Sequence, residues 1–278
     1  MNNRYPDFTA AIIQMDVSKS KEKNLRNAAK LIMRAALSNA SVVILPEMFC
    51  CPYQTATFPD YAEEAGGLIW TTLSKAAKDN HVILIGGSMP EREGDKIYNT
   101  CFCFDENGNQ IGRHRKAHLF DIQVCNGQHF KESDTLTAGD DITVIDTQFG
   151  KIGIGICYDI RFSELSRLMA LQDVRMLVYP AAFNMTTGPL HWELLFRSRA
   201  VDNQLYVIGA APARNIYSNY VSYAHSLAVS PWGKILVDGG NLECIISVPI
   251  IQKEIEAVRE QIPVLKNRRT DMYTLSEI

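Results

Sequence analysis

The chain passes from a strand to a helix within Lys151-Ile-Gly-Ile-Gly-Ile-Cys-Tyr-Asp-Ile-Arg-Phe-Ser-Glu-Leu-Ser-Arg-Leu-Met-Ala-Leu171. Isoleucine occupies every second position up to Ile156, which is typical of a β-strand. Leu165, Leu168 and Met169 then recur at the spacing of an α-helix. Cys157 therefore falls at a strand-to-helix turn, and the segment indicates an α/β fold.

The same alternation extends in both directions from this turn. Toward the N-terminus, strands are expected over 8–14, 42–45 and 82–86, helices over 22–37 and 61–78, and a hairpin turn at 105–109. Further strands are expected over 142–145, 151–156, 176–179 and 205–210, and helices over 163–171, 190–202 and 251–261. A second hairpin turns at 230–234, and its last strand ends near 248.

No linker divides the 278 residues, so one domain is expected over 1–278. The predicted strands include runs that are apolar on both faces, which indicates burial on both sides. We therefore predict an α/β fold in which two mixed sheets pack together between outer helices, a four-layer α-β-β-α sandwich.

The composition is that of a globular protein with a large core, since 46% of residues are hydrophobic and 21% are charged. A net charge of -3 and a pI of about 6.1 provide no basic surface for nucleic acid or an anionic membrane. Residues 1–20 contain neither a signal-peptide core nor a spanning segment. We expect a cytoplasmic protein with no nucleic-acid or membrane partner.

The seven cysteines are scattered, which does not fit a secreted disulfide framework. Neither the adjacent Cys50 and Cys51 nor the alternating Cys101 and Cys103 has the spacing of a zinc site. No glycine-rich phosphate loop is present. We therefore predict no metal and no cofactor.

Cys157 is the strongest candidate for a reactive residue. A strand-to-helix turn exposes a nucleophile at the edge of a sheet, and the helix start is expected to favour the thiolate. The alternative is a small buried cysteine that only fills space. The context Gly155-Ile-Cys-Tyr-Asp-Ile-Arg-Phe162 favours the nucleophile.

Two ionisable residues could act with this thiol. Glu47 follows the apolar run 42–46, so its carboxylate lies at a strand exit, where burial can raise its pKa toward that of a general base. Lys116 belongs to the basic run 112–118. The alternatives are a solvated glutamate and a charged edge strand.

Three motifs occur in order, Leu45-Pro-Glu-Met48, Arg115-Lys-Ala-His-Leu-Phe120 and Gly155-Ile-Cys-Tyr-Asp159, with 69 residues from Glu47 to Lys116 and 41 from Lys116 to Cys157. They resemble the Glu, Lys and Cys motifs of the nitrilase superfamily of carbon-nitrogen hydrolases. The resemblance covers nearly the whole chain and is closest to the omega-amidase branch, through segments 99–101, 119–122, 130–133, 179–184, 186–189, 191–194 and 199–204. Cys125-Asn-Gly127 departs from that branch, where a loop containing Pro-Gly is expected.

This resemblance implies hydrolysis of a small-molecule amide through a thioester on Cys157. Glu47 would be the general base, while Lys116 and the backbone N–H of Tyr158 would stabilise the oxyanion. Glu132, in Phe130-Lys-Glu-Ser133, would orient Lys116 and the substrate amide. A homodimer with stacked sandwiches is also implied, and we expect the tail from about 262 to pack at its interface.

The omega-amidase branch implies monoamides of dicarboxylates, chiefly 2-oxoglutaramate and 2-oxosuccinamate. Arg161 is a candidate anchor for the far carboxylate, because a guanidinium can bind it with two parallel hydrogen bonds. Tyr53 and Thr187 are possible hydrogen-bonding helpers, and Phe183 is a further candidate for the substrate site.

Several alternatives stay open at this point. Arg161 could instead form a structural ion pair with Asp159 or Glu164. An amidase acting on deaminated glutathione, or another nitrilase-family amidase, would carry the same three motifs. A catalytically silent scaffold of the same fold is the alternative outside enzymes.

Overall fold

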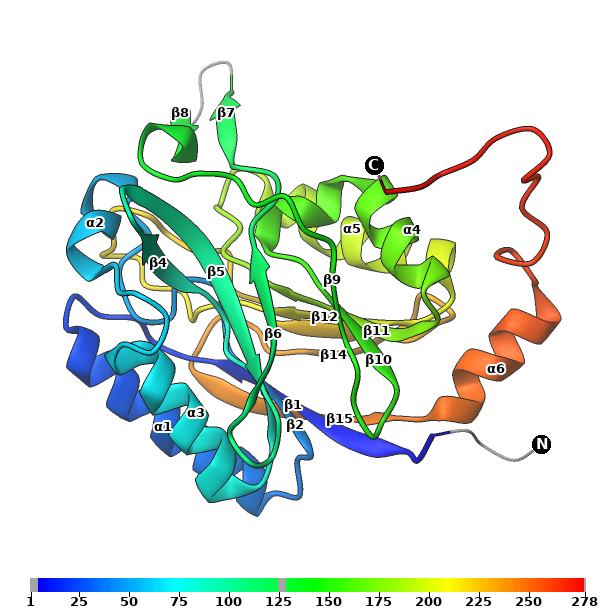
Figure 1. Ribbon diagram of the computed structural model, residues 1–278, viewed down its shortest axis with the longest axis horizontal. Helices are drawn as coiled ribbons and strands as arrows, with labels where there is room; N and C mark the ends of the chain where they lie inside the picture. Colours follow the sequence, from blue (N-terminus) through cyan, green and yellow to red (C-terminus); the bar gives the residue numbers. More distant parts are fainter. Residues whose placement is uncertain (1–4, 125–128, 278) are drawn as a thin grey trace.

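Two β-sheets packed face to face, with helices against their outer faces, form four layers in the computed structural model (Figure 1). The structure describes residues 5–124 and 129–277. This arrangement is the predicted sandwich.

The first sheet is mixed. Its strands are β1 (Phe8–Gln14), β2 (Val42–Ile44), β3 (Ile83–Ile85), β4 (Met89–Glu93), β5 (Lys96–Phe104), β6 (Gln110–Arg115) and β15 (Cys244–Ile250). They are ordered β15-β1-β2-β3-β5-β4, with β6 paired to β5. Strands β1, β2 and β3 run parallel, whereas β15 and β5 are antiparallel to their neighbours. Helices α1 (Lys21–Leu37) and α3 (Leu68–Asn80) cover its outer face (Figure 1).

The second sheet has the order β14-β13-β12-β11-β10-β9. Its strands are β9 (Thr143–Ile145), β10 (Lys151–Ile154), β11 (Val174–Pro180), β12 (Tyr206–Ala210), β13 (Leu227–Val229) and β14 (Ile235–Asp238). The central β10, β11 and β12 are parallel. Helices α4 (Ser163–Leu171) and α5 (Gly188–Asn203) lie on the side away from the first sheet (Figure 1). Outside both sheets lie α6 (Gln252–Gln261) and the two-stranded ribbon of β7 (Asp121–Gln123) and β8 (His129–Lys131).

Strand β1 shows how the layers are specified. Successive side chains of a strand point to opposite faces. Ala10 and Ile12 share a core with Ile154 of the other sheet, whereas Ala11 and Ile13 pack with the residues of α1. Because both faces of β1 are covered, its central residues 10–13 are all apolar, as expected for a strand buried on both sides.

The single helix predicted over 61–78 is wrong. The structure has a short α2 (Phe58–Tyr61) and a separate α3 that begins at Leu68. Between them the backbone of Glu63 pairs with β4, and Gly66 adopts a positive φ of 89°, a conformation that glycine accepts without strain. The apolar spacing continued across this break, and β4 was not predicted.

The other predicted helices and hairpins are confirmed, with shifts of one or two residues at some ends. Within residues 5–124 and 129–277, no helix combines the length and apolarity needed to cross a membrane. The loop difference at Cys125-Asn-Gly127 lies outside the described residues.

Candidate active site

Cys157 lies at the carboxyl end of β10, at the first position of a 3-10 turn over Cys157–Arg161 that leads to α4. Its φ of 47° places a non-glycine residue in the left-handed region, a conformation that costs about 1–3 kcal/mol and is frequent at active sites. Gly155 permits this path, since a Cβ there would lie 2.5 Å from the Tyr179 ring. The predicted turn position of Cys157 is confirmed.

Glu47 follows β2 and is 1% exposed, so the solvated alternative is wrong. Its Oε1 accepts hydrogen bonds from Lys116 Nζ at 3.0 Å and Asn99 Nδ2 at 2.8 Å. The Tyr53 hydroxyl lies 3.2 Å from the same oxygen. The other oxygen, Oε2, is buried and has no hydrogen-bond partner among the described residues.

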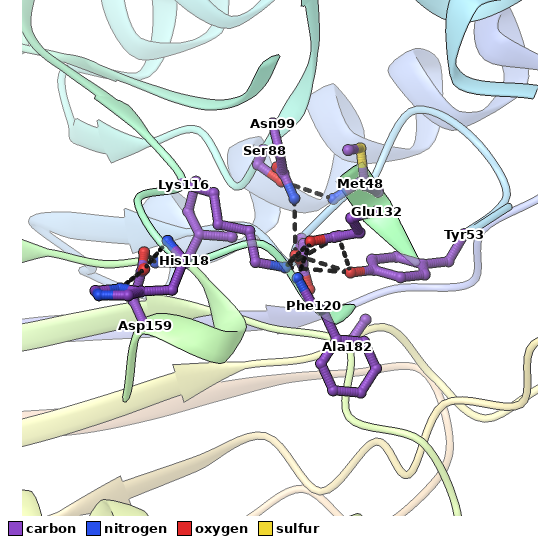
Figure 2. Close-up of polar contacts among 12 residues, drawn as sticks. Met48, Tyr53, Ser88, Asn99, Lys116, His118, Phe120, Glu132, Asp159 and Ala182 are labelled. Carbon is purple, nitrogen blue, oxygen red and sulfur yellow. Dashed lines mark hydrogen bonds and ion pairs between the residues drawn. The ribbon is translucent and has the colours of Figure 1, made fainter. Parts of the chain in front are cut away.

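Glu132 holds Lys116 from the opposite side. Its carboxylate lies 2.9 Å from Lys116 Nζ and accepts hydrogen bonds from the Tyr53 hydroxyl at 2.6 Å and the Phe120 N–H at 2.7 Å. Figure 2 shows the side chains of Lys116, Glu132, Tyr53 and Asn99 converging on this point. A buried ammonium between two carboxylates is fixed in position by hydrogen bonds to both.

Neighbouring residues of the basic run 112–118 point to opposite sides and have different roles. Arg113 and Arg115 are partly exposed and form ion pairs with Glu91 and Glu93, which is the edge-strand role. Lys116, by contrast, is 0% exposed. The charged edge strand, the alternative for this run, is therefore correct for Arg113 and Arg115 and wrong for Lys116.

The charges of this cluster are strongly coupled. Burial raises the pKa of the Glu47 carboxyl, and Lys116 opposes that rise. Burial also disfavours the charged form of Lys116, but Glu132 and Glu47 outweigh it and raise the pKa of the ammonium. Lys116 therefore stays protonated, while Glu47 has an increased affinity for a proton.

Burial, together with Glu47, raises the pKa of the Cys157 thiol well above its usual range. The expectation that a helix start favours the thiolate is therefore wrong, because α4 begins only at Ser163 and burial dominates. The backbone N–H of Ala182 and the charge of Lys116 act in the opposite direction. A thiol in this state needs a base to remove its proton.

A cavity of about 330 Å³ reaches this cluster at Glu47 and Tyr53, while Cys157 and Lys116 are not part of its wall. Glu47, Tyr53 and Ala182 form part of its wall, together with Tyr220, whose ring lies 4.7 Å from that of Tyr53. Neither Tyr220 nor Ala182 was predicted as a site residue. Tyr220 is remote from the three motifs and no local pattern marks it, whereas Ala182 belongs to the segment 179–184 that carries the family resemblance and precedes the predicted Phe183.

Arg161 lies near Cys157, outside the cavity wall, and has no carboxylate partner among the described residues. Its Nη1 donates a hydrogen bond to His191 Nδ1 at 3.1 Å, and its guanidinium carbon is 4.9 Å from the centre of the Phe183 ring and 5.7 Å from that of Tyr158. Its Nε is buried and unpartnered among the described residues, and burial lowers its pKa. The ion pair with Asp159 or Glu164 is therefore wrong.

The structure uses Thr187 differently from the prediction. Its hydroxyl donates to Asn184 Oδ1 at 3.1 Å at the start of α5, and the residue, like Arg161 and Phe183, is not part of the cavity wall. Tyr53 does line the cavity, but its hydroxyl is already engaged by Glu132.

No three His, Cys, Asp or Glu side chains in the described part of the chain gather closely enough to hold a metal ion. The buried cluster instead combines a thiol, a carboxylate of raised pKa and a fixed ammonium beside a cavity. A nucleophile, a base and a cation for an oxyanion are the groups that acyl transfer requires.

The chain belongs to the carbon-nitrogen hydrolase family, which it matches over residues 9–260. The omega-amidase NIT2 of Mus musculus is 48% identical over 268 residues, covering 96% of this chain and 97% of that protein. The omega-amidase NIT2 of Homo sapiens is 46% identical over 268 residues with the same coverage. These similarities confirm the resemblance to the omega-amidase branch.

The crystal structure of Nit3 from Saccharomyces cerevisiae, a member of branch 10 of the nitrilase superfamily, has the same fold. The two structures align with a TM-score of 0.87 at 43% sequence identity, covering 95% of this chain and 97% of that one. The predicted sandwich is thereby confirmed.

Proposed function

We propose that this protein is an omega-amidase that hydrolyses monoamides of dicarboxylates to the dicarboxylate and ammonia. The observation that carries the proposal is the buried cluster in which Lys116 bridges Glu47 and Glu132 next to Cys157. The full-length similarity to proteins named omega-amidase supports the choice of reaction.

In the acylation step, Glu47 removes the proton from Cys157 Sγ, and the sulfur attacks the amide carbon. Lys116 stabilises the negative charge that develops on the former carbonyl oxygen, with the Tyr158 N–H as a second donor. Such a donor is typically worth about 2.7–4 kcal/mol of barrier. The C–N bond then breaks, and Glu47 returns the proton to the departing ammonia.

In the deacylation step, Glu47 takes a proton from water, and the resulting hydroxide attacks the thioester carbon. The C–S bond breaks, the acid is released and Cys157 regains its proton. Glu132 takes no proton in this scheme. With Tyr53, it holds Lys116 at the oxyanion position.

Arg161 is the proposed anchor for the far carboxylate of the substrate. The guanidinium already shares the neighbourhood of Cys157, whose thiolate charge would favour its protonated form. Because no carboxylate of the described chain neutralises it, an anionic ligand would supply the missing partner. Phe183 and Tyr158 support its flat face, whereas Thr187 is left with a structural role.

Further features of the protein belong to the same proposal. We expect one carbon-nitrogen hydrolase domain, a homodimer in which the tail from about 262 lies at the interface, and a cytoplasmic location. No cofactor enters the scheme, and the acidic pI of about 6.1 argues against a nucleic-acid partner.

The test is a panel in which ammonia release is measured from 2-oxoglutaramate, succinamate, glutamine, deaminated glutathione and an aliphatic nitrile. We expect the first two to be hydrolysed fastest and the nitrile to be inert. Cys157→Ala serves as the blank. A clear preference for deaminated glutathione would replace the substrate class, and release equal to the blank from every amide would favour the silent scaffold.

A further inference from the structure

Asp159 lies two residues after the nucleophile and is 0% exposed. Each of its two carboxylate oxygens accepts two hydrogen bonds from the protein, so neither oxygen is free to bind the substrate. None of these four bonds takes part in acylation or deacylation.

One of these bonds holds the nucleophile's turn. Asp159 Oδ2 accepts from the N–H of Ile156 at 2.9 Å, immediately before Cys157. This contact closes the turn in which Cys157 has its positive φ. The strained backbone at the nucleophile is thus tied directly to the Asp159 carboxylate.

The other bonds reach the strand that carries the cation. His114 Nε2 lies 3.0 Å from Oδ2, while His118 places its N–H 2.9 Å and its Nδ1 2.8 Å from Oδ1. These two histidines precede and follow Lys116 by two residues. Asp159 therefore binds the chain on both sides of Lys116. Figure 2 shows Lys116 extending from beside the Asp159–His118 pair to Glu132.

The far end of the turn is held as well. The His118 ring stacks on Phe162, with ring centres 3.6 Å apart and planes 9° from parallel, directly after the turn over Cys157–Arg161. His114 Nδ1 also lies 3.1 Å from the hydroxyl of Thr143 in β9. Residues of the first sheet are thereby joined to the second sheet at the nucleophile.

The two sheets are separate hydrogen-bonded units, so backbone pairing does not set the position of Cys157 relative to Lys116. We propose that Asp159 is a positioning residue, which holds the Cys157 turn in a fixed position relative to Lys116 across the interface of the two sheets. The Asp159 carboxylate stays ionised, because the hydrogen bonds from His114 and His118 outweigh the effect of burial and lower its pKa. The inference rests on the proposed roles of Cys157 and Lys116.

The test is Asp159→Asn, which keeps the shape but replaces one acceptor oxygen by a donor that faces other donors. A displacement of about 1 Å in a reacting group can cost about 100-fold in rate. We expect kcat to fall by about that factor with KM within about threefold of wild type. Alkylation of Cys157 by iodoacetamide, which needs no substrate, should slow by about tenfold because the thiol has moved from its base.

The matched control is Gln14→Met. Gln14 is also 0% exposed and also makes four hydrogen bonds, but to Ser226 and the 239–242 segment. It should lower the thermal midpoint while leaving kcat per folded molecule and the alkylation rate unchanged. Asp159→Asn must differ from this control in both rates.

A second variant covers the case in which Asp159→Asn does not fold. His118→Phe keeps the stack on Phe162 and the backbone bond to Asp159 but removes the Nδ1 contact, so a fall of about tenfold in kcat is expected. Folded Asp159→Asn or His118→Phe with wild-type kcat and alkylation would overturn the inference. Slow alkylation together with an altered substrate preference would uphold it while rejecting the proposed substrate class.

Discussion

Replacing Arg161 offers the sharpest test of how the site selects its substrate. Arg161→Lys keeps the positive charge but loses the planar fork, whereas Arg161→Met removes both. Arg161 forms no ion pair within the described chain, so the substitutions break no internal salt bridge. Any selective effect on anionic substrates can then be assigned to the substrate carboxylate.

The size of the effect follows from the surroundings of the guanidinium. A hydrogen bond to a charged group contributes about 1.5–3 kcal/mol, and about 1.4 kcal/mol corresponds to a tenfold change. Because Arg161 is half-buried, the lower end of this range applies. We expect kcat/KM for succinamate to fall about tenfold in Arg161→Lys, which loses one of the two bonds, and about 100-fold in Arg161→Met.

The assay compares succinamate with butyramide, in which a methyl group stands where succinamate has its carboxylate. Ammonia release from butyramide should change less than about threefold in either variant. Arg167→Lys is the matched control, because Arg167 is also a partly buried arginine whose pKa is lowered by burial. It lies with residues of the segment 262–275, whereas Arg161 lies beside Phe183 and Tyr158.

Equal losses for succinamate and butyramide would refute the anchor, since the defect would then concern the reaction and not the carboxylate. Equal losses in Arg161→Lys and Arg167→Lys would also refute it. Loss of succinamate turnover alone, with a smaller effect of lysine than of methionine, is the result that the geometry requires.

Three further predictions concern the reacting groups. Cys157→Ala should fold normally and lose turnover, and iodoacetamide should label Cys157 first in the wild type; turnover surviving in the variant would disprove the thioester. Lys116→Met leaves Glu47 and Glu132 buried without their cation, so turnover should vanish and the free energy of unfolding should fall by about 3–5 kcal/mol at about pH 7. Burial already raises the pKa of Glu47 and Lys116 opposes that rise, so in this variant the folded pKa of Glu47 exceeds its unfolded value and urea titrations should show stability recovering as the pH falls through it; a loss independent of pH would contradict this. Finally, because Glu47 must be ionised to act and burial raises its pKa, the acid limb of kcat/KM should lie above pH 4.5, the value for an unperturbed glutamate, and a limb at or below that value would argue against Glu47 as the base.

The sequence alone identified most of the elements because their signals are local. The isoleucine alternation before Cys157 and the helical spacing after it lie within one segment, and both are confirmed. The failure over 61–78 has the same origin. Apolar spacing continued through a break that depends on Glu63 pairing with β4, a contact outside the segment.

The three motifs also identified Glu47, Lys116 and Cys157 as the candidate reacting groups, since the types and order of these residues resemble those of an amide hydrolase. The motifs did not show how close Glu47, Lys116 and Cys157 lie to one another in space. Tertiary structure alone brought Glu47, Lys116 and Glu132 to within hydrogen-bond reach and added Tyr220 to the cavity wall. Among the described residues it also left Arg161 without the acidic partner that the alternative interpretation required.

The physical reason is that periodicity records which face of an element is buried, but not which element covers it. Cys157 belongs to one sheet, whereas Glu47 and Lys116 follow strands of the other. Their meeting depends on how the two sheets pack and on links such as that of Asp159 to His114 and His118. Local sequence thus determined the strands, the helices and the candidate groups, and the packing of the two sheets decided which groups share a site.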